Sequence, residues 1–317
     1  MSLRPLSNQR HAFIILQCRE LSKLAMSEVL GRQPYPWQEE VLCHLAMMKV
    51  PASGLSPGPV LLVRPTGGGK SSIRDVHSIE NGGISLTITP LLSLGADQES
   101  KINQTAKQVN GPVVAIHLDE HRDPQHQRSI ANRLAALPPN TDTTVLLFSS
   151  PQAIVHNEIW HSMIETIIAN KTLSLLCVDE VHLFVHFGLS FRPEFALLQN
   201  VLFKLIRFRT LAQGNELSKT LTNVPVLFMT ATCNKTIVEQ IQVLSGFKFR
   251  IPENVFWPSA DAMQHRHVAI NVVYTTAALE CFKKEIGQVL AQNHTSKYIW
   301  YCNNRSTVER HAQSILI

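Results

Sequence analysis

The chain has 317 residues, of which 44% are hydrophobic and 17% charged, and its formal net charge is +5 at pH 7. This composition is ordinary for one large or two small folded domains, and it excludes a chain dominated by disorder. No apolar run is long enough to span a membrane, and the apolar stretch 11–16 is too short for a secretory signal, so we expect an intracellular protein without a membrane partner.

The cysteines and histidines show no metal-binding or disulfide pattern. The 6 cysteines contain no C-x-x-C pair, and the 14 histidines form no H-E-x-x-H spacing. We therefore expect neither a zinc site nor a disulfide framework. The mild positive charge is compatible with a polyanionic partner but does not by itself indicate one.

Apolar segments recur along the chain, separated by polar stretches that suit helices. They are 59–63, 84–90, 113–118, 143–149, 173–178 and 224–229. Each is apolar throughout rather than alternating, which is typical of parallel strands covered by helices on both faces. The sequence thus predicts an α/β fold with a parallel sheet flanked by helices, in which ligands gather at the carboxyl ends of the strands.

The first of these segments is followed by a glycine-rich loop that suits nucleotide phosphates. We assign to this loop Pro65, Thr66, Gly67, Gly68, Gly69, Lys70, Ser71 and Ser72. The three glycines let the backbone adopt positive φ and bring bare N–H groups against phosphate oxygens. A helix that begins after Lys70 adds its partial positive charge. Lys70 is placed to reach the β and γ phosphates and the Ser71 hydroxyl to hold Mg²⁺, so ATP and Mg²⁺ are the expected cofactors.

This phosphate loop is a variant of the common pattern. The pattern G-x-x-x-x-G-K-[ST] has glycine where this chain has Arg64. The alternative interpretation is a glycine-rich turn with an exposed lysine. The position between a predicted strand and a predicted helix favours the phosphate loop.

Two acidic residues, Asp179 and Glu180, follow the predicted strand 173–178. At a strand end, Asp179 is placed to hold the Mg²⁺ shared with Ser71, and Glu180 to orient the water that attacks the γ-phosphate. The alternative is a pair of surface acids that cap the next helix. With the phosphate loop present, we interpret Lys70, Asp179 and Glu180 as the catalytic residues.

The motifs, in their order and spacing, resemble those of superfamily 2 helicases, and most closely those of the RecQ family. The resemblance covers roughly residues 30–317 and is carried by Pro65–Ser71, Thr87–Gln98, Ser149–Gln152, Asp179–His182, Phe191–Phe195, Met229–Thr232 and Ile299–Arg305. It implies a RecA-like P-loop NTPase domain over 31–255, preceded by a helical extension over 1–30. It also implies that 262–317 is the incomplete start of a second RecA-like domain.

The resemblance also assigns roles to single residues. Gln38 stands where the family reads the adenine edge, although Tyr35 replaces the usual arginine nearby, and Phe187 stands where the family has tryptophan. Nucleic-acid contacts are implied for Thr89, Pro90, Ser93, Ser150, Phe191 and Arg192. Coupling of the two sites is implied for Thr230, Ala231 and Thr232. The alternative for the Ser and Thr residues is the ordinary role of turn and helix-cap residues.

The function that the resemblance implies is that of an ATP-dependent 3′-to-5′ DNA helicase, acting on single-stranded DNA or on a duplex with a single-stranded tail. It would be nuclear in a eukaryote. No arginine-finger motif follows before Ile317, so we expect poor turnover, because such a finger contributes about 10³–10⁵ in rate. Two alternatives stay open: an ATP-binding module without unwinding activity, or a decayed paralogue, and another superfamily 2 motor that acts on RNA or translocates on duplexes.

Overall fold

The computed structural model describes residues 19–21, 23–24, 26–29, 31–49, 58–90, 92–109, 113–139, 141–187, 193–206, 224–250, 253–259 and 284. The chain divides into two compact units, residues 1–264 and 265–317. Every helix and strand given below belongs to the first unit. The segment 262–317, expected to begin a second RecA-like domain, lies outside the described residues apart from residue 284.

The described part of the first unit alternates strands and helices. The strands are β1 (Val60–Val63), β2 (Gly83–Ile88), β3 (Val113–Leu118), β4 (Thr144–Ser149), β5 (Leu173–Val178), β6 (Val226–Thr230) and β7 (Val255–Phe256). The helices are α2 (Pro36–Lys49), α3 (Lys70–Asn81), α4 (Leu92–Val109), α5 (Pro124–Ala135), α6 (Pro151–His156), α7 (Glu158–Ala169), α8 (His182–Phe187), α9 (Glu194–Leu198), the π-helix η1 (Gln199–Phe203) and α11 (Lys235–Ser245). Within the described ranges, no helix has both the length and the apolarity needed to cross a bilayer.

All the strands join one parallel sheet, in the order β3-β4-β2-β5-β6-β1-β7. This confirms the predicted α/β fold with a parallel sheet. Because the strands are parallel, their carboxyl ends lie along one edge, where the segments after β1, β5 and β6 become neighbours. The sheet order therefore brings the phosphate loop, the acidic pair and the segment after β6 together.

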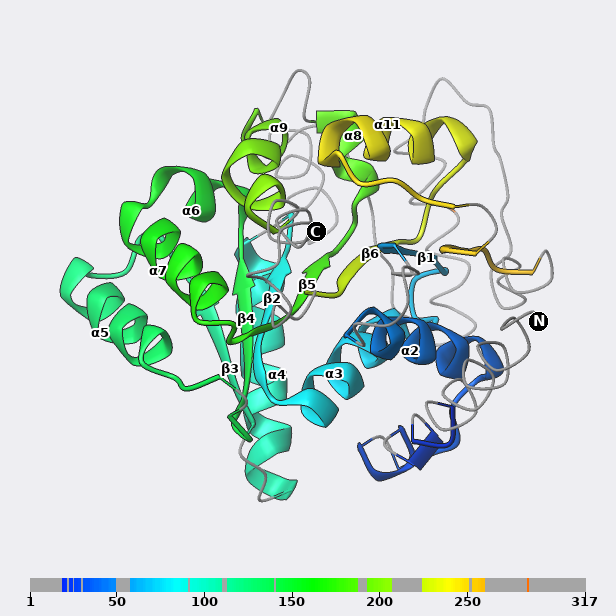
Figure 1. The fold of residues 1–317 in the computed structure, drawn as a ribbon, viewed down its shortest axis with the longest axis horizontal. Coiled ribbons are helices and arrows are strands. Elements are labelled where there is room, and N and C mark those ends of the chain that lie inside the picture. Colours follow the sequence, from blue (N-terminus) through cyan, green and yellow to red (C-terminus); the bar gives the residue numbers. More distant parts are fainter. Residues whose placement is uncertain are drawn as a thin grey trace, which may run out of the picture. The chain divides into compact units, whose positions relative to one another are not determined.

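Helices cover both faces of the sheet, as Figure 1 shows, and the strand residues on both faces are apolar. On β1, Leu61 and Val63 pack into the core beneath α5 to α11, whereas Val60 and Leu62 pack on the opposite face against α2 and α3. Strands buried on both sides read as continuous apolar runs. The same burial explains why the sequence pattern located these strands to within a few residues.

Several helices at this edge begin at side-chain caps. Asp123 accepts a hydrogen bond from the backbone N–H of His126 at the start of α5, and Asn234 caps α11 by accepting from the N–H of Ile237. Such caps satisfy N–H groups that a helix leaves without partners in its first turn. They fix where each helix leaves the carboxyl edge of the sheet.

Candidate nucleotide site

The phosphate loop runs from the end of β1 to the start of α3. Gly67 and Gly69 have φ of 76° and 87°, in the region that favours glycine. A Cβ on Gly68 would lie 2.9 Å from the carbonyl oxygen of Pro65, so this position also requires glycine. Helix α3 begins at Lys70, as the sequence predicts. The N–H of Gly68 donates to the Pro65 carbonyl at 3.0 Å, so an anion would be met by the other N–H groups of the loop and of the start of α3.

A hollow of about 350 Å³ lies against this loop. It is lined by Thr66, Gly67, Gly69, Lys70, Ser71, Ser72, Asp179 and Glu180. The Nζ of Lys70 donates hydrogen bonds to the carbonyl oxygens of Arg64 (3.0 Å) and Pro65 (3.3 Å). The structure therefore brings the predicted lysine, hydroxyl and two carboxyl groups to one cavity, although they come from two distant parts of the sequence.

The acidic pair continues directly from β5. The backbone N–H of Asp179 donates to Ile88 at 2.9 Å, and that of Glu180 donates to the Asp179 carboxylate at 3.0 Å. Glu180 has φ of 47°, which is uncommon for a residue with a side chain and stores strain of the kind found at functional sites.

The carboxyl group of Asp179 lies in a poorly solvated position. Burial raises its pKa, the nearby cations Arg74 and Lys70 oppose this, and the neighbouring Glu180 carboxylate reinforces it. Two adjacent carboxylates with this charge balance favour a divalent cation, which would hold both ionised. Among the described residues no group of three or more His, Cys, Asp and Glu side chains forms a metal site. A cation here would therefore need the Ser71 hydroxyl and ligand oxygens as well.

His182 lies between the acidic pair and the end of β6. His182 Nδ1 lies 2.8 Å from Thr230 Oγ1 and 3.4 Å from Glu180 Oε2. The Thr230 hydroxyl donates to the carbonyl of Thr232 at 3.0 Å and accepts from the Thr232 N–H at 3.1 Å. The ring of His182 thus contacts both the Glu180 carboxylate and the Thr230 hydroxyl.

A second and larger hollow, of about 640 Å³, adjoins the other side of the loop. It is lined by Arg32, Tyr35, Trp37, Arg64, Pro65, Gly67, Gly68, Gly69 and Ser259. Four of these side chains form a stack. The Arg32 guanidinium lies 5.0 Å from the Tyr35 ring centre, Tyr35 and Trp37 are stacked at 6.3 Å, and the Arg64 guanidinium lies 4.6 Å from Trp37.

Gln38 lies behind the loop rather than in either hollow. Its side chain is fully buried, its Oε1 accepts from the Tyr35 N–H at 3.0 Å, and its Nε2 donates to the Gly69 carbonyl at 3.2 Å. In this geometry Gln38 braces the phosphate loop. Its predicted contact with an adenine edge stays a prediction and requires the side chain to move.

Comparison with known proteins identifies the family. The model of the DEAD/DEAH box helicase family matches residues 47–241. The chain belongs to this family. The ATP-dependent DNA helicase RecQ of Pasteurella multocida (strain Pm70) is 27% identical over 255 residues, which cover 80% of this chain and 34% of the relative. RecQ of Haemophilus influenzae is 26% identical over 299 residues, covering 92% of this chain and 39% of the relative.

These relatives show that the chain is a RecQ-like member of superfamily 2, and that it spans little more than a third of their length. Among solved structures, the crystal structure of the DUF1998 helicase MrfA superposes with a TM-score of 0.57 at 16% identity, covering 94% of this chain and 40% of that one. At this identity the likeness concerns the fold, and it agrees with a RecA-like α/β domain.

Four of the residues predicted to contact nucleic acid are described, and three of these four are buried. Thr89 is fully buried and its N–H donates to Ser149 at 2.9 Å, and Pro90 is also buried. Ser93 is exposed on the first turn of α4. Ser150 is 2% exposed and caps α6 by accepting from the Ala153 N–H at 3.0 Å, which is the alternative role that the sequence left open.

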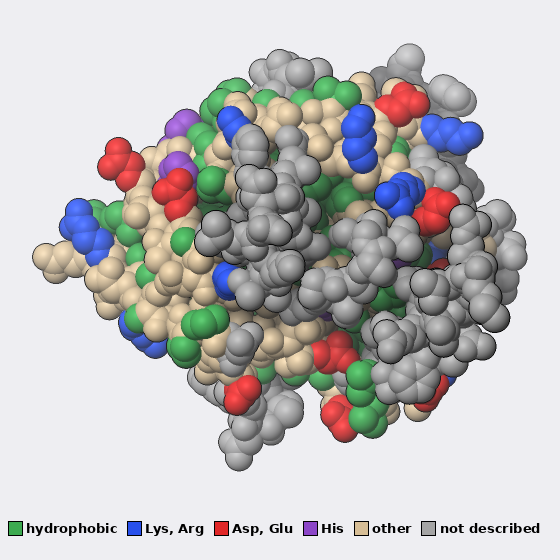
Figure 2. All heavy atoms as spheres, in the orientation of Figure 1, with side chains coloured by type: hydrophobic (Ala, Val, Ile, Leu, Met, Phe, Trp, Pro, Cys, Tyr) green, Lys and Arg blue, Asp and Glu red, His purple; other side chains and the backbone are tan. Residues whose placement is uncertain are grey.

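The remaining predicted contacts, Phe191 and Arg192, lie outside the described residues. Figure 2 shows one face of the molecule, on which the described Lys and Arg side chains lie among neutral and acidic ones.

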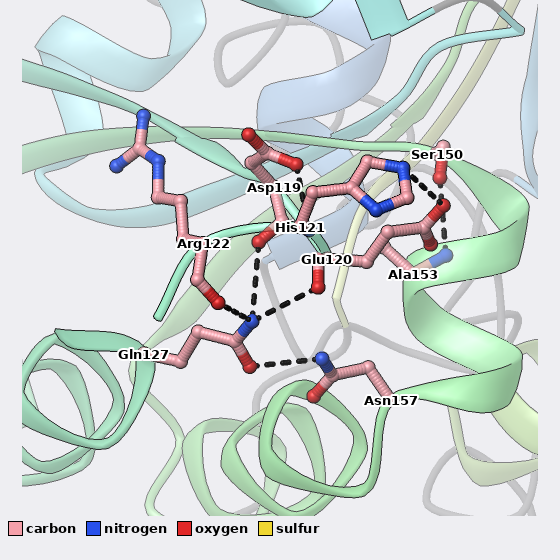
Figure 3. Close-up of polar contacts among 8 residues, drawn as sticks. All are labelled: Asp119, Glu120, His121, Arg122, Gln127, Ser150, Ala153 and Asn157. Carbon is pink, nitrogen blue, oxygen red and sulfur yellow. Dashed lines mark hydrogen bonds and ion pairs between the residues drawn. The ribbon is translucent and has the colours of Figure 1, made fainter. Parts of the chain in front are cut away.

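The loop between β3 and α5 is fixed beside this edge, as Figure 3 shows. The Gln127 amide donates to the carbonyls of Asp119 (3.5 Å), Glu120 (3.1 Å) and Arg122 (2.8 Å), and its oxygen accepts from Asn157 at 2.9 Å. One buried amide thus ties the loop to the start of α7. The position of the β3–α5 loop at the carboxyl edge of the sheet is therefore fixed by hydrogen bonds within the fold.

Sequence reasoning did not single out three residues that the structure places at the site. His182 is the last residue of the Asp179–His182 motif, but its contact with Thr230 depends on β5 and β6 being neighbours. Arg32 and Trp37 stand close to Gln38 in sequence, and no local pattern indicates that their side chains stack.

Proposed function

We propose that this chain is the ATP-binding part of an ATP-dependent DNA helicase of the RecQ type, which couples 3′-to-5′ unwinding to ATP hydrolysis. The observation that carries the proposal is the hollow in which Lys70 and Ser71 face Asp179 and Glu180. A cationic amine, a hydroxyl, open backbone N–H groups and two carboxylates form the set of groups that phosphoryl transfer requires.

Each of these groups has a separate task. Lys70 leaves the loop carbonyls and neutralises the terminal phosphates, while backbone N–H groups of the loop donate hydrogen bonds to the phosphate oxygens. Mg²⁺ held by Ser71 and Asp179 would neutralise the charge that develops on the transferring group. Glu180 orients the attacking water, and His182 contacts both Glu180 and Thr230.

The larger hollow suits a purine base, which lies at the end of the nucleotide away from the terminal phosphates. Tyr35 is 53% exposed and its ring lies between Arg32 and Trp37, so a base can stack on this group of rings and guanidinium planes. The two hollows share Gly67 and Gly69, so a single elongated ligand can occupy both.

The proposal that the polymer is DNA rests on the relatives that are named DNA helicases. We propose single-stranded DNA, or a duplex with a single-stranded tail, as the partner. Exposed Ser93, at the first turn of α4, supplies a hydroxyl of the kind that contacts phosphate or sugar without reading bases.

The nucleotide part is tested by equilibrium binding of Mg-ATP. Wild-type protein should bind, and Lys70→Ala should lose at least about 10-fold in affinity, because one charge-assisted contact contributes about 1.5–3 kcal/mol. Lys235→Ala, which removes an exposed lysine at the start of α11, is the matched control and should bind as the wild type does. Equal binding by Lys70→Ala would refute the phosphate-loop interpretation.

The polymer part is tested by fluorescence anisotropy with single-stranded DNA, tailed duplex DNA, blunt duplex DNA and RNA of the same sequence. We expect binding to single-stranded and tailed DNA that weakens as salt rises, because phosphate contacts release counterions. Tighter binding to RNA, or to blunt duplex, would contradict the RecQ-type assignment and favour another superfamily 2 motor.

A further inference from the structure

Arg64 is a nearly buried cation that forms no ion pair with any acid in the described part of the chain. Its side chain is 8% exposed, and its Nε has no hydrogen-bond partner among the described residues. Burial lowers the pKa of this guanidinium, and the field of Glu40 offsets the effect only in part. No ion pair within the described ranges joins Arg64 to an acid. Burying a charge without an ion-pair partner is costly, and an anionic ligand would offset that cost.

The position of Arg64 is fixed before any ligand arrives. Its backbone N–H donates to the carbonyl of Thr230 at 3.0 Å, and its guanidinium lies 4.6 Å from the Trp37 ring centre. It replaces the first glycine of the common phosphate-loop pattern, so the usual loop chemistry does not account for it. The side chain lines the larger hollow together with the three loop glycines.

The side chains that line the two hollows suit different parts of a nucleotide. Lys70 and the two carboxyl groups in the smaller hollow suit the terminal phosphates and their metal, and the stacked rings in the larger hollow suit the base. Gly67 and Gly69 belong to both, and the phosphate attached to the sugar must pass between them. Arg64 lies on the base side of this passage.

We infer that Arg64 is a nucleotide-binding residue whose guanidinium takes the α-phosphate, the phosphate joined to the sugar. The inference rests on the proposed nucleotide site and adds a residue to it. It makes a distinct prediction about specificity: Arg64 favours ligands that carry a phosphate on the sugar, whereas Lys70 favours ligands that carry linked terminal phosphates.

The test compares adenosine, AMP, inorganic pyrophosphate and ATP as competitors of a fluorescent ATP analogue. In Arg64→Met the advantage of AMP over adenosine should shrink by about 10- to 100-fold, the effect of losing one charge-assisted hydrogen bond. Adenosine and pyrophosphate should bind as they do to the wild type. Lys70→Ala should show the reverse, with weaker pyrophosphate and an unchanged advantage of AMP over adenosine.

Two further variants separate charge from packing. Arg64→Gln keeps a planar group over Trp37 without the charge and should behave as Arg64→Met does, whereas Arg64→Lys should keep most of the AMP advantage. Loss of adenosine and AMP binding in equal measure would overturn the inference, because it would show that Arg64 only shapes the hollow. So would an AMP advantage that survives in Arg64→Gln. If the wild type binds neither ATP nor pyrophosphate, the proposed nucleotide site itself is wrong.

Discussion

Arg74 gives the sharpest prediction about what holds the site together. It lies on α3, one turn after Lys70, and only 1% of its side chain is exposed. Its Nε and Nη2 donate to one carboxylate oxygen of Asp75 at 2.8 and 2.6 Å, and its Nη1 donates to Gln98 on α4 at 2.6 Å. The guanidinium also lies 4.9 Å from the Phe148 ring centre. The perturbation is Arg74→Met, which keeps the apolar stem and removes the charge and all three hydrogen bonds.

The expected loss of unfolding free energy depends on how well water can solvate the Asp75 carboxylate that remains. Breaking a buried ion pair by removing one partner costs about 3–5 kcal/mol, because the other charge loses its compensation. The Asp75 side chain is 26% exposed and water can solvate it in part, so the lower end of that range, about 3 kcal/mol, applies. With a urea slope of about 3 kcal/mol per M, the unfolding midpoint should fall by about 1 M.

The assay is urea unfolding of the whole chain followed by far-UV circular dichroism. Arg128→Met, which removes an exposed arginine from α5, is the control and should change the unfolding free energy by less than about 0.5 kcal/mol. The double variant Arg74→Met with Asp75→Asn removes both charges and should recover at least about 1 kcal/mol. A midpoint for Arg74→Met equal to that of the control refutes the reasoning. Failure of the double variant to recover means that packing, and not charge, accounts for the loss.

Three further predictions concern His117, Gly95 and Gln38. Burial lowers the pKa of His117 by more than the nearby carboxylates raise it, so the pKa in the folded state lies below the unfolded value of about 6.5. The stability that the neutral ring contributes is therefore present above the unfolded pKa and is lost at lower pH. His117→Asn should therefore lose less unfolding free energy than the wild type between about pH 7 and pH 5, and equal slopes would disprove this. Gly95→Ala places a Cβ 2.5 Å from the His117 ring and should lower the melting temperature by the equivalent of about 1–3 kcal/mol; His117→Ala should suppress this effect. Gln38→Ala removes the brace on the Gly69 carbonyl, so pyrophosphate as well as ATP should bind about 5-fold more weakly; unchanged pyrophosphate affinity would show that Gln38 acts on the base alone.

The strands could be predicted from the sequence because they are continuous apolar runs. The segments 113–118 and 173–178 agree with β3 and β5 residue for residue. Strand β7 was missed, since its two residues, Val255 and Phe256, are too few to show a period. The order of the strands was not predicted either, because pairing between β1 and β6 joins residues more than 160 positions apart and no local pattern records it.

The site was predicted where one short segment carries the chemistry, and missed where it depends on that strand order. Lys70 and Asp179 each stand in a motif that specifies a role, and the structure places both in one hollow. The sequence did not show the burial of Gln38, the contact between His182 and Thr230, or the burial of Arg64 Nε without a hydrogen-bond partner, because each depends on how other elements pack.

The resting geometry of the loop also bears on how it receives a ligand. Contacts to three elements hold it: Lys70 of α3 donates to the carbonyls of Arg64 and Pro65, Gln38 of α2 donates to the carbonyl of Gly69, and the Arg64 N–H donates to the carbonyl of Thr230 in β6. A phosphate competes only with the first, since it takes the amine of Lys70 and leaves the other two unchanged. The loop therefore keeps its shape when Lys70 moves, so binding does not have to order the backbone. The affinity for phosphate then depends on the strength of the hydrogen bonds from Lys70 to the loop carbonyls, which the phosphate must replace. The end of β6 stays bonded to the loop whether or not a nucleotide is bound.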